Sequence, residues 1–495
     1  MTETSVLYYG DNLAVLREYL PPESVDLIYL DPPFNSNATY NVLFKEPGTG
    51  EQSKSQITAF EDTWHWTAEI ERAFQEIVES APSEVVDLML SLRRAVREND
   101  ILAYLTMMCI RLLELKRVLK ETGSIYLHCD PTASHYLKVV LDAVFGKRNF
   151  RNEIVWCYTG PSRPVKDFPR KHDVIFRYSK SDEYFSNLEG VRIPYKALHT
   201  DKGKEARIWG KEGKLQDERV RKKYIERGKI PEDFWIDIPS GGHISPKERL
   251  GYRTQKPEAL LERIIKASSN EGDVVLDPFC GCGTAVAVAE KLGRRWIGID
   301  ITHLAIAVVK ERLKRNFPEI QFKVVGEPKD LAGAKALATQ NRYQFQWWAL
   351  SLVGARPYGG GGGSGGKKGK KGKKGADTGI DGFYYFNDGG TTKKAVVSVK
   401  SGKVGVSQIR ELNAVVEREK AEMGFFLTLE PATRPMIEEA AKNGDFKDSF
   451  GSKYPKTQIF TIEELFSGKE PDAPQKLPVF SLNTTACNAA ASGRK

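Results

Sequence analysis

The sequence predicts an α/β protein with more than one domain, and three observations lead to this prediction. Short apolar runs typical of buried β-strands occur at residues 25–30 and 274–276. The second run leads into a glycine-containing turn at residues 277–284, as in nucleotide-binding βαβ units. The length of 495 residues exceeds one ordinary core and corresponds to about two to four domains.

The first predicted strand, residues 25–30, ends at Asp31. Pro32 and Pro33 follow, and they cannot continue a strand ladder because proline lacks a backbone N–H group. Residues 35–58 are polar and contain glycine, so we expect a mobile loop beside the end of this strand.

Leucine and methionine at helical spacing predict a helix over residues 102–119, which Gly123 is expected to stop. Residues 124–128 are then a second buried strand.

The regular pattern returns near Pro257, which suits the first turn of a helix. A helix over residues 284–292 follows the glycine turn. A strand over residues 296–299 that ends at Asp300 then completes the βαβ unit.

Positive charge is concentrated in two segments of this chain, whose net charge is +9. Residues 151–250 carry 22 Lys plus Arg against 16 Asp plus Glu, and residues 359–375 add six lysines and no acid, which leaves the remainder near −3. This distribution fits contacts with nucleic-acid phosphates, and equally a solvated basic surface. Residues 151–250 are also aromatic, so they form either a segment that reads nucleic acid or a small subdomain with its own core. Residue types alone favour the subdomain.

A second folded region is expected in the C-terminal part of the chain. Residues 359–375 consist of Gly and Lys blocks and are expected to be a flexible linker. Strands over residues 396–399 and 424–428 flank a helix over residues 406–417. The tail, residues 467–495, has little periodicity and is expected to be loosely ordered.

The glycine turn has the residues needed to bind a cofactor. Gly281 and Gly283 allow the backbone to approach a ligand closely. Asp277 can accept bonds from an ammonium group and Asp300 from two ribose hydroxyls, a combination that describes S-adenosylmethionine. NAD is the alternative, but its fingerprint needs a third glycine or an alanine variant, and Thr284 follows Gly283 here. A nonspecific glycine turn also stays open.

The residues after the first strand could bind an exocyclic amine of a nucleic-acid base. Such a nitrogen is a poor nucleophile because its lone pair is delocalised into the ring. Asp31 and the carbonyl group of Pro32 could accept both N–H bonds and free the lone pair, while Phe34 stacks on the base. Taken alone, these residues could also be a turn that simply ends a strand.

Three segments together resemble a known family. Residues 31–34 (DPPF), 254–257 (TQKP) and 277–284 (DPFCGCGT) resemble the DPPY/F, TxKP and FxGxG motifs of amino-group DNA methyltransferases. Their order along the chain is similar to that of the circularly permuted β-class. Residues 10–12 also match the opening of this family, where the acidic residue is thought to meet the cofactor adenine.

The resemblance implies a Rossmann-like S-adenosylmethionine-dependent methyltransferase fold with an inserted recognition segment, acting on double-stranded DNA with a flipped target base. An Asp in the first motif is typical of adenine-N6 enzymes, and cytosine-N4 methylation is the alternative. The implied catalytic residues are Asp31, Pro32, Pro33 and Phe34. The implied cofactor-binding residues are Asp11, Lys256, Asp277, Phe279, Gly281, Gly283, Thr284 and Asp300.

Farther along, Asp381 and Lys400 resemble the catalytic residues of Mrr-like PD-(D/E)XK restriction endonucleases, whose fold is also α/β. Such enzymes bind Mg²⁺ through acidic residues and activate water. Ser398 lies where relatives have an acid or Gln, and Gln346 lies where they often have Glu. The resemblance therefore implies either a domain that only holds DNA or a bifunctional restriction-modification enzyme, with Mg²⁺ at Asp381 only if the domain cleaves.

These resemblances imply the following division: residues 1–150, the catalytic half; 151–250, the target-recognition segment; 251–330, the cofactor half; 331–358, a connecting helix; 359–375, the linker; 376–466, the Mrr-like domain; and 467–495, the tail. We expect a cytoplasmic protein of a restriction-modification system, because no apolar stretch approaches the ~20 residues of a membrane span. The cysteine spacing is not that of a zinc site. A homodimer and a partner restriction endonuclease are further expectations.

Overall fold

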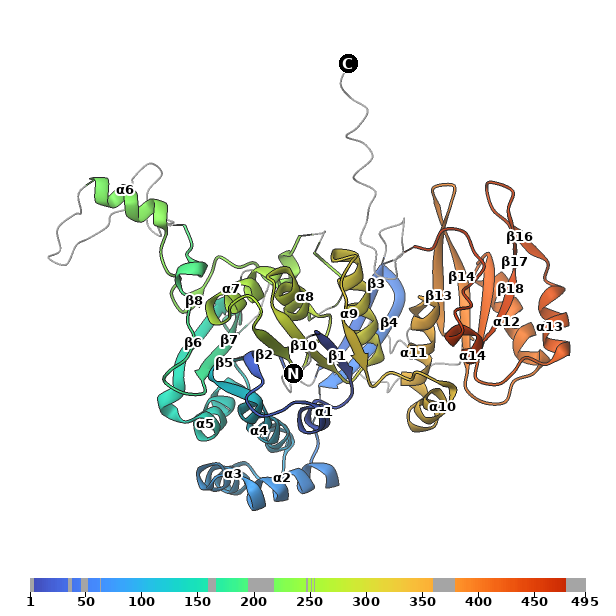
Figure 1. Ribbon diagram of the computed structural model, residues 1–495. Helices are drawn as coiled ribbons and strands as arrows, with labels where there is room; N and C mark the ends of the chain where they lie inside the picture. Colours follow the sequence, from blue (N-terminus) through green and yellow to red (C-terminus); the bar gives the residue numbers. More distant parts are fainter. Residues whose placement is uncertain are drawn as a thin grey trace.

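The computed structural model describes residues 4–33, 38–45, 52–62, 64–158, 166–194, 218–245, 248–250, 252, 254–358 and 379–477. Phe34 and the predicted linker, residues 359–375, lie outside the described residues. Two sheets organise the chain, a large one built from the first two thirds and a smaller one from the C-terminal third, and they lie side by side (Figure 1). Among the described residues, no helix is long and apolar enough to cross a membrane.

The large sheet interleaves strands from distant parts of the sequence. Its order is β11 (Lys323–Val325), β1 (Val6–Tyr9), β10 (Arg295–Asp300), β9 (Val274–Asp277), β2 (Val25–Leu30), β5 (Leu119–Cys129), β7 (His172–Ser179), β6 (Phe150–Cys157) and β8 (Phe234–Trp235). The six strands from β11 to β5 are parallel, and β7 is antiparallel to both of its neighbours. The two predicted halves of the methyltransferase therefore share one sheet.

Helices cover both faces of this sheet. Side chains alternate along β2, so that Ile28 and Leu30 face one core while Leu27 and Tyr29 face the other. The first core contains residues of α1 (Asn12–Tyr19), α2 (Ala68–Ser80), α3 (Ser83–Val96), α4 (Asp100–Val118) and α5 (Ser134–Phe145). The second contains residues of α7 (Glu258–Ser268), α8 (Thr284–Lys291) and α9 (His303–Asn316).

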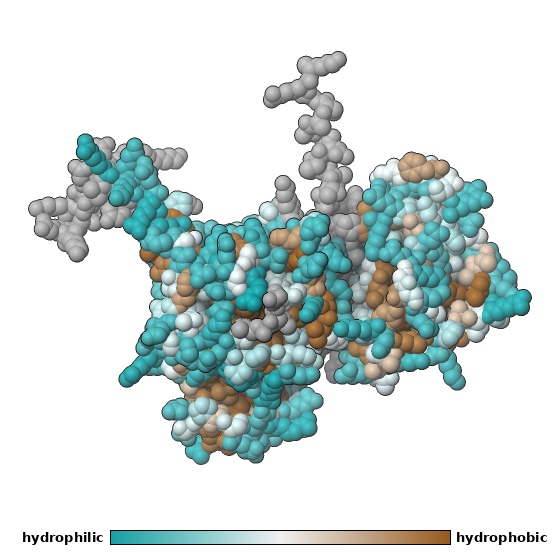
Figure 2. Space-filling view, viewed as in Figure 1, coloured by the Kyte–Doolittle hydropathy of each residue, from teal (hydrophilic) through white to brown (hydrophobic). Residues whose placement is uncertain are grey.

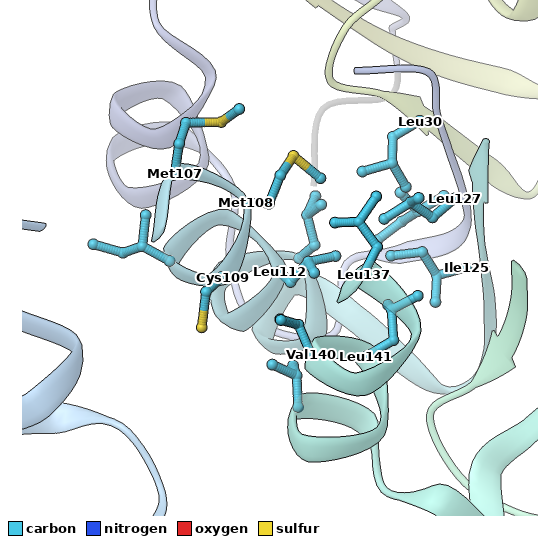
Figure 3. Close-up of a cluster of buried hydrophobic side chains, with 14 of the residues drawn as sticks. Leu30, Met107, Met108, Cys109, Leu112, Ile125, Leu127, Leu137, Val140 and Leu141 are labelled. Carbon is cyan, nitrogen blue, oxygen red and sulfur yellow. The ribbon is translucent and has the colours of Figure 1, made fainter. Parts of the chain in front are cut away.

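Figure 3 shows part of the first core, where side chains of α4 and α5 meet those of β2 and β5. Leu112, Leu127 and Leu137 have no exposed surface. Burying a leucine side chain contributes about 2 kcal/mol, so these helices are held on the sheet mainly by apolar packing.

The predicted end of helix α4 is wrong. The helix stops at Val118 and the chain enters β5 at once, so Gly123 lies inside the strand. A Cβ atom at Gly123 would lie 2.5 Å from Leu119 Cδ1 and 2.9 Å from the carbonyl oxygen of Asp26. Glycine is therefore required by close approach of the backbone to β2, and not by the end of a helix.

The mobile loop predicted for residues 35–58 is also wrong where the structure describes it. Strands β3 (Ala38–Lys45) and β4 (Gln52–Asp62) pair as an antiparallel hairpin. The threonine and aromatic residues of these two strands favour strand, whereas the polar residues around them suggest a loop.

The described part of residues 151–250 does not form a separate aromatic core. Trp156 and Trp235 are buried with the α7 side of the main sheet, and Phe176 and Tyr178 with the α4 side. The prediction of an independent subdomain is therefore wrong, because β6, β7 and β8 extend the main sheet. The segment also carries α6 (Glu218–Arg227), which projects from the body and is strongly hydrophilic (Figures 1 and 2).

The C-terminal sheet has the order β12 (Arg356–Pro357), β13 (Gly382–Asp388), β14 (Thr391–Lys400), β15 (Met423–Thr428) and β18 (Thr457–Thr461). One face packs against α10 (Leu331–Gln340), α11 (Arg342–Val353) and α14 (Ile462–Phe466). The other packs against α12 (Val406–Arg418) and α13 (Arg434–Ala441). A separate hairpin consists of β16 (Asp445–Lys447) and β17 (Lys453–Pro455).

Two details at the borders of this domain differ from expectation. Residues 331–358 form two helices and a short strand, because Asn341 ends α10 and caps α11 through its side chain. In the tail, the carbonyl of Gln475 and the N–H of Leu477 bond to β13 at 2.8 and 2.9 Å. The first part of the tail is thus ordered on the sheet, and residues 478–495 lie outside the described residues.

Candidate active site

Three carboxylates lie at one edge of the large sheet. Asp31 follows β2, Asp277 ends β9 and Asp300 ends β10. These three strands are adjacent and parallel, so their C-terminal ends meet where ligands bind in α/β folds. The structure thus brings together the two motifs that are far apart in the sequence.

One pocket contains all three carboxylates. The residues that the sequence singled out and that line it are Asp11, Asp31, Pro32, Pro33, Lys256, Asp277, Phe279, Gly281, Thr284 and Asp300. Gly283 is not among the lining residues, and Phe34 lies outside the described residues. These residues come from the segments 1–150 and 251–330, so both segments enclose one pocket.

The two carboxylate oxygens of Asp31 have different surroundings. Its Oδ2 forms an ion pair with the ammonium group of Lys256, and the side chains are 17% and 13% exposed. Its Oδ1 is buried and has no hydrogen-bond partner among the described residues. An unpaired buried acceptor is costly, so Oδ1 is the part of this site most in need of a donor from a ligand.

A hydrogen bond from the backbone to a side chain fixes the glycine turn. The Gly281 N–H donates to Asp300 Oδ2 at 2.9 Å, and Gly281 has a φ of +50°, which favours glycine. Gly283, at φ +72°, is the N-cap of α8, and a Cβ there would lie 2.8 Å from a methyl group of Val309. Gly281 therefore shapes the pocket wall, whereas Gly283 allows α8 and α9 to pack closely.

Asp277 and Asp300 both hold protons more tightly than ordinary carboxyl groups. Burial raises the pKa of Asp277 well above its usual range, and Asp31 and Asp300 add like-charge repulsion. Desolvation also raises the pKa of Asp300, although Thr302 and Gly281 donate hydrogen bonds to it. A pocket with two such carboxyl groups is suited to a ligand that carries positive charge and hydrogen-bond donors.

Asp11 is the N-cap of α1, where its Oδ1 accepts the N–H groups of Leu13 and Ala14. Its Oδ2 accepts a hydrogen bond from Arg111 of α4 at 2.6 Å. Arg111 also donates to Asn12 at 2.6 Å. Asp11 therefore lines the pocket in a fixed orientation, held by a residue from a different helix.

Sequence reasoning missed several pocket residues, among them Tyr29, Trp64, Arg111 and Tyr252. Trp64 Nε1 is buried and has no hydrogen-bond partner among the described residues. Arg111 had a detectable signal, since it is a cation within the otherwise apolar stretch of α4. Tyr252 had none, because its position depends on how the chain returns to the sheet.

The family of the chain follows from comparison with known proteins. The DNA methylase family matches residues 25–311, which is more than half of the chain and includes the strands that carry Asp31, Asp277 and Asp300. The chain belongs to the DNA methylase family. A second family, described as restriction endonuclease, matches residues 343–447 of this methylase.

Curated relatives of this methylase include three bacterial enzymes. Type II methyltransferase M.HpaI of Haemophilus parainfluenzae is 36% identical over 41% of this chain and 57% of its own length. Type II methyltransferase M.BamHI of Bacillus amyloliquefaciens is 31% identical over 64% and 58%. DNA adenine methyltransferase YhdJ of Escherichia coli is 27% identical over 63% and 83%. The methylase thus spans less than two thirds of M.HpaI and of M.BamHI.

A buried hydrogen-bond network lies behind the pocket of the methylase. The hydroxyl of Tyr29 is 3.0 Å from His128 Nδ1, and His128 Nε2 is 3.0 Å from Asp173 Oδ2. The hydroxyl of Tyr158 donates to the other oxygen of Asp173 at 3.0 Å. The pKa of Asp173 is lowered. Burial alone would raise it, but the hydrogen bonds from His128 and Tyr158 and the charge of Lys256 outweigh that effect. His128 and Asp173 thus connect β5 and β7 to Tyr29, the residue two positions before Asp31.

The C-terminal residues that resemble a nuclease site offer few ligands for a Mg²⁺ ion. Asp381 Oδ1 accepts a hydrogen bond from Gln346 at 2.8 Å, and Oδ2 accepts one from the Val399 N–H at 2.6 Å. The Ser398 hydroxyl lies 3.4 Å from the same Oδ2, and Lys400 ends β14. In the described residues, no group of three His, Cys, Asp or Glu side chains could hold a metal ion. Asp381 is thus the single carboxylate of this site, and each of its oxygens already accepts a hydrogen bond, so the protein itself offers few ligands to a Mg²⁺ ion.

Proposed function

We propose that this chain is an S-adenosylmethionine-dependent DNA methyltransferase that modifies the exocyclic N6 of adenine. The observation that carries the proposal is the buried, unpartnered Oδ1 of Asp31 among the described residues, in one pocket with Asp277 and Asp300. That arrangement provides an acceptor for an amine on one side and carboxylates for a cationic cofactor on the other. The Asp in the DPPF motif and the likeness to the DNA adenine methyltransferase YhdJ favour adenine.

Asp31 would bind and activate the amine. Its Oδ1 accepts one N–H bond of the flipped base, and the Pro32 carbonyl accepts the second, which returns the lone pair to nitrogen. Lys256 pairs with Oδ2, so the carboxylate is held in a fixed orientation. As the nitrogen gains a methyl group it must lose a proton, and Asp31 is placed to accept it. Phe34 would stack on the base.

The cofactor side of the pocket fits S-adenosylmethionine. Asp277 would bind the amino-acid ammonium group, because that cation offsets the cost of ionising a buried carboxyl group. Asp300 and Asp11 would bind the ribose and the adenine end, beside Gly281, Phe279 and Thr284. The cofactor, when bound, supplies a methyl group on a sulfonium, an electrophile that leaves behind a neutral thioether. Positioning is then the main requirement.

Double-stranded DNA is the proposed macromolecular substrate, with the target base flipped out of the helix. Residues 151–250 would recognise the site, and α6 would contact phosphates through its exposed basic side chains, including Lys222, Lys223 and Arg227. We place the reaction in the cytoplasm, as part of a restriction-modification system. A homodimer and a separate partner endonuclease belong to the same proposal.

The test is methyl transfer to unmethylated genomic DNA, followed by mass spectrometry of the nucleosides. The wild-type protein should produce N6-methyladenine, and Asp31→Asn and Asp31→Ala should lower kcat at least about 100-fold. Asp87→Asn, a change at an exposed carboxylate of α3 outside the pocket, is the matched control. Near-wild-type transfer by Asp31→Ala would refute the role of Asp31, and N4-methylcytosine as product would refute adenine.

A further inference from the structure

Helix α11 connects the two parts of the chain. It lies within the segment that matches the restriction endonuclease family, yet it packs along α9 of the methylase sheet. Leu304 and Ala307 of α9 face Trp347 and Ser351 of α11 across a shared hollow. The C-terminal domain therefore touches the helix that begins directly after the cofactor edge of the sheet.

Gln344 of α11 makes a hydrogen bond across this boundary. Its Oε1 accepts the backbone N–H of His303 at 3.0 Å. His303 is the first residue of α9, and the N–H groups of the first turn of a helix have no acceptor within that helix. The N-cap residue Thr302 satisfies the N–H of Ala305, so Gln344 provides the acceptor for a second one.

The residues beside this bond form the wall of the pocket. Thr302 donates from both its N–H and its hydroxyl to Asp300 Oδ1, at 2.9 and 2.8 Å, and Ile301 and Thr302 line the pocket. The His303 ring is buried and stacks on Tyr9 with ring centroids 3.6 Å apart. Tyr9 precedes Gly10, whose N–H donates to the Asp300 carbonyl at 2.9 Å. A shift of His303 would therefore move Asp300.

The other side of the same helix turn is fixed in the C-terminal domain. Gln346, two residues after Gln344, donates to Asp381 at 2.8 Å, and Phe345 between them is buried in the C-terminal core. The rotation of α11 about its axis is thus set by contacts on the side away from α9. Gln344 is held in place by a domain that contributes no described residue to the pocket itself.

We propose that Gln344 is a positioning residue for the cofactor site, through which the C-terminal domain holds the loop from Asp300 to Thr302 in its binding geometry. The inference rests on the proposed function, since it assigns the ribose-binding role to Asp300. Loss of the acceptor leaves a buried N–H unpaired, which loosens α9 at its first residue and Asp300 with it.

The hydrogen bond can be separated from the shape of the side chain by two substitutions. Gln344→Met keeps the length of the side chain and removes the acceptor, whereas Gln344→Glu keeps an acceptor oxygen, and a negative charge there suits a helix N-terminus. Gln340→Met, at an exposed position of α10, is the matched control. All four proteins are full-length chains.

S-adenosylmethionine binding is measured by calorimetry, and KM and kcat by methyl transfer. We expect Gln344→Met to raise Kd and the KM for S-adenosylmethionine about tenfold with kcat and the KM for DNA little changed, and Gln344→Glu to restore them. Unchanged Kd in Gln344→Met, or equal losses in both Gln344 variants, would overturn this inference. If the wild-type protein itself binds no S-adenosylmethionine, the proposed function fails instead.

Discussion

Asp31 and Lys256, which are 225 residues apart in the sequence, form an ion pair at the C-terminal end of β2. The pair joins the catalytic motif of the first half to the TxKP motif of the second. It leaves one oxygen of Asp31 for a ligand and fixes the direction in which that oxygen points. In the proposed function, the lysine would therefore orient Asp31 as well as line the cofactor side of the pocket.

Replacing this lysine should affect both rate and stability. In Lys256→Met, the carboxylate loses its partner and can rotate, and a misplacement of about 1 Å costs roughly 100-fold in rate. An unpaired buried charge should also cost about 3 kcal/mol of unfolding free energy. Single-turnover methyl transfer and urea denaturation measure the two effects. Lys256→Arg keeps the charge and should lose much less, so equal losses in both variants would argue against the ion pair as the cause.

Asp277→Asn should separate stability from cofactor binding. Because the pKa of Asp277 is raised, the folded ligand-free protein keeps a proton that the unfolded chain has already released. Its stability therefore falls as pH rises from the ordinary carboxyl range through the raised pKa. The asparagine variant has no proton to lose at this position, so its stability should not fall in this pH range. It should therefore be more stable than the wild type at neutral pH.

The same substitution should weaken S-adenosylmethionine binding about tenfold to hundredfold, because a charge-assisted hydrogen bond is lost. In the wild-type protein, affinity should fall as pH decreases through the raised pKa, since the ammonium group needs the ionised carboxylate. Urea denaturation and calorimetry over a pH series test both statements. An Asp277→Asn variant that is less stable at every pH would contradict the assignment.

The buried network behind the pocket should contribute mainly to stability. His128→Phe leaves the Tyr29 hydroxyl and an oxygen of Asp173 without partners, which should cost about 3 kcal/mol of unfolding free energy. Tyr158→Phe removes only one donor to Asp173 and should cost about 1 kcal/mol. Chemical denaturation ranks the two variants. A His128→Phe protein as stable as the wild type would show that the network is not needed for folding.

The C-terminal domain should neither bind Mg²⁺ at Asp381 nor cut plasmid DNA. Asp381 is the single carboxylate of this site, and its oxygens already accept hydrogen bonds from Gln346 and from the Val399 N–H. The double substitution Gln346→Glu with Ser398→Glu would supply the missing acids. We expect it to bind Mn²⁺ measurably by electron paramagnetic resonance, where the wild type does not. Plasmid cleavage by the wild-type protein, abolished by Asp381→Asn, would disprove this expectation.

The strands and the cofactor turn could be predicted because their signals are local. Residues 25–30 and 274–277 are apolar runs with polar ends, and two glycines directly after such a run favour a tight turn where a ligand can approach the backbone. Where the aromatic side chains of residues 151–250 pack could not be predicted, because such side chains pack equally well in a small core or against a larger sheet. Only the pairing of β7 with β5 decides between them.

The site was predictable where the family motifs name a residue and unpredictable where packing creates a contact. The positions of Asp31, Asp277 and Asp300 follow from the ends of predicted strands. Three contacts of the site join residues far apart in the sequence: the ion pair of Lys256 with Asp31, the ion pair of Arg111 with Asp11, and the hydrogen bond between Gln344 and His303. No local pattern carries that information.

The interleaved strand order also has a consequence for synthesis. Strands β1 and β2 pair with β10 and β9, which are translated far later. Until Asp300 has left the ribosome, the apolar early strands lack these neighbours, and such delayed pairing makes folding slow and nascent chains prone to aggregate. A translation product interrupted earlier would carry the complete DPPF motif but lack the strands that place Asp31 beside Asp277 and Asp300.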